Sequence, residues 1–565
     1  MRGLAIFALA SVLACESIRA EHVLPSPSFE AGSGVEMRIT NYYETIPPTG
    51  LLPLRVEVKN LSEMRRVWRI RTIHSQFGLR SMQFVTSLAV DAHTERTFEL
   101  LVPVAPGSLT ISRYSTLAIE ISGYGVVNGT TSEHASSSGL SPSPFLGMGE
   151  ALAVNQWGPL RERMEKTHSR ALDGSAVDPA LLPEDWRGLA GFEIMVFADF
   201  EWRQIRGPQR NAIEDWVIQG GKLVLMRASG AEASDLPAVG ELGIGEVIHW
   251  LPTDSFQDSV VQLLLTKDLP GAGSPLQNYT WQWPLALSLG RPEPPALLII
   301  SFMVSFALVI GPLNFLAFAP QGHRHRLFWT TPAIALAASV IMGMFITLSE
   351  GFGGKGDRFD VLLNLPHLRK SAVWQEQVSR TGVLTSGAFM LSEPSLILPI
   401  ALRDTPGGYA LSERGRRYLL DGATWSGDWF RSRTTQAQLF AAVRPTRSQV
   451  QLVTSPDGVP SAVSFFEDEL PELWYFDDHD VAWRGEKIRP GEKQPLHRAE
   501  PQAFALWWKD VLKPAGFVTR HRAQAFAKDR KGKFFASTVK PRPIASLKVI
   551  RWKDFGGLIM GRASP

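Results

Sequence analysis

Two carboxylates, Asp199 and Glu201, stand where the sequence most readily suggests ligand chemistry. Residues 194–197 form an unbroken apolar run, which is typical of a strand buried on both faces of a parallel sheet, and both acids follow it closely. Open α/β sheets bind ligands beyond the carboxyl ends of their strands. Asp199 and Glu201 are therefore candidate ligand-binding residues. The simpler interpretation is a polar strand end, because most polar loop residues bind nothing.

Three other patterns could suggest chemistry, and each has a simpler explanation. Residues 351–356 (GFGGKG) match the spacing of a dinucleotide-binding motif, but they follow an apolar span, so we interpret them as a flexible exit loop. Residues 477–480 (DDHD) lie between alternating segments and predict a solvated hairpin turn instead of a metal site. His323 and His325 have no carboxylate or thiolate beside them, which disfavours a metal pair. We expect no metal and no cofactor.

Nucleophilic catalysis lacks its usual residues in this chain. Cys15 is the one cysteine among 565 residues, and no G-x-S-x-G motif places a serine on a sharp turn. Residues 1–20 combine one early basic residue, an apolar run and a polar end, which predicts a secretory signal peptide. Alternatively, residues 12–15 (VLAC) are a lipobox, and Cys15 is a lipid-modified N-terminus. One cysteine allows no disulfide within the chain.

Two long apolar segments define the membrane topology that we expect. Residues 296–319 and 327–349 carry no charge, and each is long enough to cross a ~30 Å hydrocarbon core as a helix. Arg324 and Arg326 lie in the short connection, and short loops rich in Lys or Arg stay in the cytoplasm. The export signal requires the same orientation. We therefore expect a transmembrane hairpin in the bacterial cytoplasmic membrane, with both large soluble regions on the periplasmic side.

The soluble regions divide by their periodicity. Residues 25–128 contain alternating runs such as LPLRVEVKN, which predict an antiparallel β-sandwich, and residues 129–149 include a Ser/Pro/Gly-rich stretch that we interpret as a linker. Residues 150–290 predict an α/β domain. Residues 358–565 return to β-type patterns, with AFALWWKDVL (503–512) as the clearest helix. The expected fold is multidomain.

The α/β domain carries the most specific pattern. After the strand at residues 194–197, Pro208 suits a first helical turn, Ile213, Trp216 and Val217 share one face, and two glycines precede the next strand, KLVLM. A strand, helix and strand at this spacing predict a βαβ unit in a doubly wound parallel sheet. Trp216 is expected to lie on the buried face of its helix.

The stretch LLPEDWRGLAGFEIMVFADFEWRQIRGPQRNAIEDWVIQGGKLVLM, followed by GIGEVIHW and by the hairpin, resembles bacterial membrane proteins that carry a class I glutamine amidotransferase-like domain before their spans. The resemblance covers about residues 181–349. It implies a doubly wound α/β domain. The enzymes of that class place a cysteine on a sharp strand-to-helix turn, with His and Glu partners, and this sequence has no cysteine there. The resemblance therefore implies an amidotransferase fold without its hydrolytic chemistry.

Two functions remain open from the sequence. Lys+Arg 58 and Asp+Glu 55 nearly balance, so nothing suggests nucleic acid as a partner. The first hypothesis is a non-catalytic, membrane-anchored envelope protein that binds the lipid bilayer and other envelope or membrane proteins. The second is a ligand sensor or hydrolase that uses Asp199 and Glu201. We prefer the first, because it needs no missing nucleophile.

Overall fold

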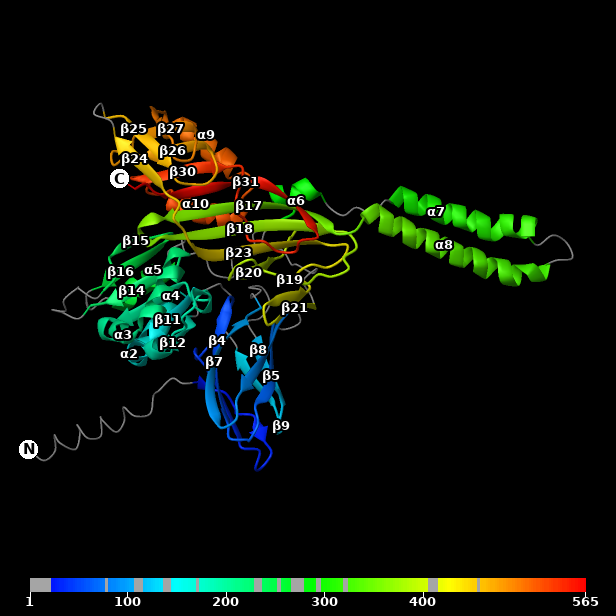
Figure 1. Ribbon diagram of the computed structural model, residues 1–565, viewed down its shortest axis with the longest axis horizontal. Helices are drawn as coiled ribbons and strands as arrows, with labels where there is room; N and C mark the ends of the chain where they lie inside the picture. Colours follow the sequence, from blue (N-terminus) through cyan, green and yellow to red (C-terminus); the bar gives the residue numbers. More distant parts are fainter. Residues whose placement is uncertain are drawn as a thin grey trace, which may run out of the picture.

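The protein is described by a computed structural model covering residues 22–76, 80–105, 115–135, 144–168, 172–227, 236–250, 256–265, 279–290, 296–318, 324–404, 415–454 and 458–564. The expected signal peptide, Cys15 and His323 lie outside these residues. The described chain is multidomain and rich in strands, with several sheets and two long apolar helices that project side by side from the remainder (Figure 1).

The N-terminal region contains two larger antiparallel sheets that share one core, and a separate two-stranded sheet. Alternation places Leu54, Val56 and Val58 inward, whereas Arg55 and its polar neighbours point away, which confirms the expected period of two. The first sheet has the order β1-β3-β4-β7, and the second begins β10-β8-β5-β6. The strands are β1 (His22–Val23), β2 (Ser28–Phe29), β3 (Val35–Asn41), β4 (Leu51–Asn60), β5 (Arg66–Gln76), β6 (Arg80–Val90), β7 (Thr94–Pro103), β8 (Ser115–Gly123), β9 (Val126–Asn128) and β10 (Thr130–Ala135).

The expected linker at residues 129–149 contains two strands in the structure. β10 pairs along its whole length with β8 as an antiparallel edge strand. Phe145–Gly149 forms β11, a fully buried strand of the next domain. Composition did not reveal either strand, because Ser and Thr suit an exposed edge strand as well as a linker. Residues 136–143 lie outside the described part of the chain.

The α/β domain is built on a six-stranded sheet with the order β12-β11-β13-β14-β16-β15. All its pairings are parallel except the edge pair β15–β16, and the predicted βαβ unit is confirmed as β13, α4 and β14. The elements are β12 (Asp173–Val177), β13 (Ile194–Ala198), β14 (Lys222–Met226), β15 (Gly240–Leu242), β16 (Gly245–Trp250), α2 (Glu150–His168), α3 (Asp199–Gln204), α4 (Gly207–Ile218), α5 (Phe256–Leu265) and the short η1 (Pro179–Leu181) and η2 (Trp186–Gly188).

Helices cover both faces of this sheet. Ile194 and Val196 of β13 belong to one hydrophobic cluster with residues of α2 and α5. Met195 and Phe197, which point to the opposite face, belong to another cluster with Ile213 of α4. This is the arrangement of a doubly wound domain.

The C-terminal region forms a nine-stranded sheet with the order β20-β23-β18-β17-β31-β30-β26-β27-β29, and a three-stranded sheet, β24-β25-β28. The predicted helix at 503–512 is confirmed as α9. The elements are β17 (Gly354–Leu365), β18 (Lys370–Thr381), β20 (Leu396–Ile400), β23 (Thr435–Pro445), β24 (Val450–Thr454), β25 (Pro460–Ser464), β26 (Leu470–Phe476), β27 (Ala482–Ile488), β28 (Lys493–Pro495), β29 (His497–Arg498), β30 (Lys533–Thr538), β31 (Ile550–Arg562), η7 (Pro366–Leu368), α9 (Pro501–Val511) and α10 (Phe517–Phe526).

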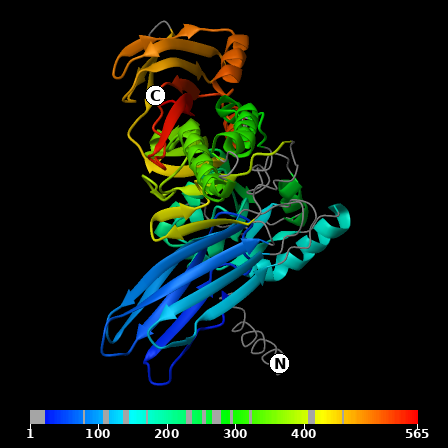
Figure 2. The same ribbon diagram turned by 90° about the vertical axis from the view of Figure 1, so that its right-hand side faces the viewer.

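Chain segments from before and after the hairpin fold into one body. β21 pairs in parallel with β6, so the C-terminal region adds β21, β22 and β19 to the second sheet of the N-terminal sandwich. Figure 2, viewed along the hairpin, places the sandwich and the C-terminal sheet at opposite ends of this body. The added strands are β19 (Phe389–Met390), β21 (Arg416–Asp421) and β22 (Thr424–Gly427).

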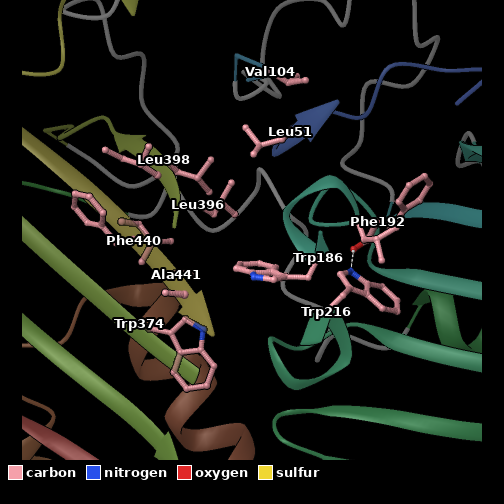
Figure 3. Packing of buried hydrophobic residues seen from close by; sticks show 14 of the residues in the cluster. Leu51, Val104, Trp186, Phe192, Trp216, Trp374, Leu396, Leu398, Phe440 and Ala441 are labelled. Carbon is pink, nitrogen blue, oxygen red and sulfur yellow. Dashed lines mark hydrogen bonds between the residues drawn. The ribbon is translucent and has the colours of Figure 1, made fainter. Parts of the chain in front are cut away.

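The three regions also share a core. Leu51 of the sandwich, Trp186 of the α/β domain and Phe440 of the C-terminal sheet belong to one cluster (Figure 3). Polar contacts cross the same junction: Trp374 Nε1 donates to Gln219 Oε1 at 2.5 Å, and Gln219 Nε2 donates to the carbonyl of Ala442 at 2.8 Å. Because burial and hydrogen bonds both cross the junction, the regions are expected to unfold together.

The two apolar segments are helical. The first comprises α7 (Ala296–Leu308) and η5 (Val309–Phe318), where the helix widens around Pro312, which has no N–H to donate. The second is α8 (Leu327–Glu350), preceded by η6 (Arg324–Arg326). Asn314 Nδ2 donates to Thr331 Oγ1 at 3.0 Å and links the two helices. Both are long and apolar enough to cross a membrane, and neither is buried by protein.

Candidate functional site

The candidate site at the carboxyl end of the parallel sheet lies between β11 and β13. The chain runs from β11 to β12 on one side and then crosses back over β11 to β13 on the other, so the direction of strand order reverses here. Such a reversal is where doubly wound domains bind ligands. The structure brings Glu201 into this position, in the first turn of α3, and Asp199 begins the same helix. Both side chains are buried, Glu201 to 2% exposure and Asp199 to 7%.

The Glu201 carboxylate fills the reversal point itself. It accepts hydrogen bonds from the backbone N–H of Ala198 and of Ala151, both at 2.8 Å, and so links the end of β13 to the start of α2. A Cβ atom on Gly149 would lie 2.1 Å from Glu201 Oε2, so glycine is required where β11 ends. Burial raises the pKa of Glu201, and these backbone hydrogen bonds oppose that rise.

In this arrangement the Glu201 carboxylate occupies the position at which an anionic ligand would otherwise bind. Helix N-termini attract negative charge through their unpaired N–H groups and their dipole. Here the carboxylate of Glu201 already occupies the N-terminal ends of α2 and α3. An anionic ligand would have to displace a side chain that is held by two strong hydrogen bonds. The geometry therefore gives Glu201 a structural part in this domain.

The turn at residues 477–480 is confirmed as the connection of an antiparallel hairpin between β26 and β27. Asp477 accepts hydrogen bonds from the backbone N–H of His479 and of Val481, both at 2.9 Å, and from the Trp483 indole at 3.0 Å. These hydrogen bonds keep the pKa of Asp477 below its usual value despite some burial. Among the described residues, no group of three or more His, Cys, Asp or Glu side chains could hold a metal ion.

The segment at residues 351–356 differs from the expected flexible loop. Its second half, from Gly354, is the start of β17, and Phe352 forms a bridge with Val383. Gly351 and Gly353 have φ values of +71° and +81°, which favour glycine. The glycines of this segment therefore allow the backbone conformation that leads into β17.

Sequence reasoning missed Asp360, a buried carboxyl in β17. Asp360 is 5% exposed, and neither carboxyl oxygen has a hydrogen-bond partner. Burial raises the pKa of Asp360 to about 7, with a further rise from Asp554, whereas Arg358 and Arg444 lower it. Asp360 lines a cavity of about 130 Å³, and the ion pair between Lys540 and Asp468 is part of its lining. The alternation in RFDVLL gives no signal of this cavity, because distant segments form its walls.

A second missed cluster joins the segment before the hairpin to the C-terminal region. The buried Glu376 carboxylate accepts hydrogen bonds from the Tyr279 hydroxyl and from the backbone N–H of Gly516 and Thr519. Burial lowers the pKa of the neighbouring Arg522 to about 10, although Tyr279 and Glu376 oppose this. Tyr279 precedes the first span and Glu376 follows the second, so this network joins chain segments from before and after the hairpin.

Comparisons with known proteins give no family. No family model and no curated protein matches the sequence. A cycloisomaltooligosaccharide glucanotransferase from Paenibacillus sp. is similar over 33% of this chain and 27% of its own, at 11% identity and a TM-score of 0.17. The sporulation control protein Spo0M of Bacillus subtilis is similar over 18% of this chain and 48% of its own, at 10% identity and a TM-score of 0.14. A yeast delta-COP-I mu-homology domain is similar over 38% of this chain and 96% of its own, at 10% identity and a TM-score of 0.16. Scores this low define no shared fold, so the site must be interpreted from its own geometry.

Proposed function

We propose that this protein is a membrane-anchored component of the bacterial envelope whose external body binds other envelope or membrane proteins without catalysing a reaction. In this proposal the α/β domain is the amidotransferase-like domain that the sequence resembles, with its catalytic position lost. The hairpin is the anchor in the lipid bilayer, and the three soluble domains form the surface that partners contact.

The observation that carries the proposal is that the segments before and after the hairpin pair with each other in one sheet. β6 precedes both spans and β21 follows them, and the two strands pair residue by residue from Arg80 with Arg416 to Val85 with Asp421. Strands that pair in this way must lie on one side of a membrane. Two crossings of the membrane by the hairpin return the chain to the same side and so satisfy this condition. The pairing therefore supports a hairpin anchor that carries one soluble body.

The side that the body faces is inferred from the charge of the connection between the two helices. Arg324 and Arg326 lie in the short connection, where positive charge favours the cytoplasm. Phe328 and Trp329 lie in the first turn of α8, and both are 76% exposed. Aromatic side chains of this kind are enriched at membrane interfaces. The charge supports a cytoplasmic connection and a periplasmic body, and the aromatic residues support a membrane interface at the start of α8.

The alternative is a sensor or hydrolase that uses Asp199 and Glu201. The internal hydrogen bonds of Glu201 favour the non-catalytic proposal, because they commit that carboxylate to the fold. Purified protein is expected to release no ammonia from glutamine. Release that disappears in Asp199→Ala would favour the alternative.

Site-specific photocrosslinking in intact membranes tests the proposal. A photoreactive residue at Val127 or Val539, each 67% exposed on the external body, is expected to yield discrete adducts with other membrane or envelope proteins. The matched control is Leu297, which is 84% exposed within the first span and is expected to yield lipid adducts. External positions that yield no protein adducts would contradict a partner-binding role.

A further inference from the structure

A row of basic side chains crosses one end of the nine-stranded sheet. Lys355 of β17 lies directly opposite Arg380 of β18 and directly opposite Arg551 of β31. Residues in register on neighbouring strands point to the same face, and the strands lie about 4.8 Å apart. All three side chains are exposed, and within the described residues neither Lys355 nor Arg551 takes part in an ion pair. We call these three residues the basic row.

The acidic residues of the same strand ends do not neutralise the basic row. Asp357 is the next residue on the same face of β17, but it is 5% exposed and accepts a hydrogen bond from the Ser288 hydroxyl. Asp554 points to the opposite face, where Arg358 Nη2 donates to its Oδ2 at 3.3 Å. Like charges that face each other across neighbouring strands repel, so an anion from outside the chain would stabilise the basic row.

The basic row lies next to the end of the second span. α8 ends at Glu350 and β17 begins at Gly354, so Lys355 is at most about 17 Å from the helix end along the chain. A helix of 24 residues is about 36 Å long and exceeds a ~30 Å hydrocarbon core. Figure 1 shows the corresponding ends of β17 and β18 facing the hairpin. When α8 spans the bilayer, the basic row therefore lies near the lipid headgroups.

Two exposed apolar side chains lie between the basic row and the span. Phe352 is 69% exposed and Val549 is 45% exposed. The two are close in space, because a Cβ on Gly353 would lie 2.9 Å from Val549 Cγ2. Protein surfaces that rest on a membrane combine cations, which meet the headgroups, with apolar side chains, which enter the boundary beneath them. A lipid accounts for both features, whereas a free anion accounts only for the cations.

We propose that the basic row binds the phosphate of an anionic phospholipid, with Phe352 and Val549 in contact with the apolar part of the same lipid layer. The two guanidinium groups and the ammonium group can each donate charge-assisted hydrogen bonds to phosphate oxygens. This inference rests on the proposed function, because it requires α8 to span the membrane. It deepens that function by naming one class of lipid as a partner and by assigning its site.

Native mass spectrometry of the detergent-solubilised, full-length protein tests the inference by titration with phosphatidylglycerol or phosphatidylcholine. The two lipids share their acyl chains and phosphate, but only phosphatidylglycerol carries a net negative charge, so it is expected to bind more tightly. In a double variant, Lys355→Gln with Arg551→Gln, the affinity for phosphatidylglycerol should fall about 30-fold, as expected when two surface cations are lost. An unchanged affinity would overturn the inference.

Two other double variants separate a specific site from a general effect of charge. Lys487→Gln with Lys493→Gln removes two exposed cations from β27 and β28, and Figure 1 shows β27 on the far side of the body from the hairpin. This control should keep the wild-type affinity. Lys355→Arg with Arg551→Lys keeps both charges and should retain most of the affinity.

Three outcomes of these titrations would contradict a lipid site at the basic row. An equal loss in both glutamine pairs would show that only net charge matters. Displacement of phosphatidylglycerol by millimolar inorganic phosphate would indicate a site for a free anion. Equal affinity of the wild type for phosphatidylglycerol and phosphatidylcholine would show that the lipid charge is not recognised.

Carbonate extraction of membranes distinguishes failure of this inference from failure of the anchor. The wild type and all three double variants should stay in the membrane fraction, because the apolar helices hold them there. Release of the wild type would contradict the anchor and, with it, this inference. Retention together with no preference for phosphatidylglycerol would overturn this inference alone.

Discussion

Replacing Trp216 by alanine is expected to lower the free energy of unfolding by about 3–5 kcal/mol, the usual loss for a large buried aromatic residue. Trp216 is 2% exposed, and its Nε1 donates to the carbonyl of Phe192 at 3.1 Å. Its ring also lies against Gly221, where an added Cβ would approach Trp216 Cε2 to 2.2 Å. The variant therefore loses packing on α4 and leaves a buried carbonyl without its donor.

Denaturant unfolding of the detergent-solubilised protein, followed by circular dichroism, measures this loss. Phe200→Ala is the matched control, because Phe200 lies in the same domain but is 52% exposed; its effect should stay within about 0.5 kcal/mol. A loss for Trp216→Ala as small as that of the control would mean that this face of α4 does not support the core.

Replacing Asp360 by asparagine is expected to change the free energy of unfolding more favourably at pH 8 than at acidic pH. The difference between the two pH values should reach up to about 4 kcal/mol. Burial raises the pKa of Asp360 from 3.8 to about 7 in the folded protein. Between these values the folded state holds a proton that the unfolded state has released, so stability falls as the pH rises from about 4 to about 7. Three pH units at about 1.4 kcal/mol each give the estimate.

Thermal unfolding of wild type and Asp360→Asn at pH 5 and pH 8 measures the part of this difference that arises between pH 5 and about 7, which is about 2.7 kcal/mol. Asparagine does not titrate, so the advantage of the variant should grow with pH. Asp478→Asn, at an exposed position of the hairpin turn, should show no such growth. An Asp360→Asn difference that is equal at both pH values would show that Asp360 keeps its charge, for example through bound water.

Sequence periodicity predicted the elements better than their assembly. The alternation in LPLRVEVKN and the apolar run before Asp199 both depend on neighbouring residues, and both correspond to the expected strands. The pairing of β21 with β6 joins residues more than 330 positions apart through backbone groups, which carry no residue-specific signal. The edge strand β10 was missed for a related reason, since a Ser/Thr-rich segment becomes a strand when a partner is available.

For the candidate sites as well, the sequence predicted the local elements but not the contacts between distant segments. The sequence placed Asp199 and Glu201 at the end of a parallel strand, but it could not indicate that Glu201 would bond Ala151, 50 residues earlier. Asp360 has ordinary neighbours in sequence. Its importance arises from burial by distant segments, and from carboxyl oxygens that have no hydrogen-bond partner after folding. Such properties emerge only from three-dimensional packing.

Topology mapping in intact cells tests the central claim most directly, namely that one external body is assembled from both segments flanking a membrane hairpin. Reporter fusions near Ser138 and near Gly458 should both report an external location, and a fusion within residues 321–326 should report the cytoplasm. A cytoplasmic signal near Gly458 would place the paired strands β6 and β21 on opposite sides of the membrane and would contradict the account.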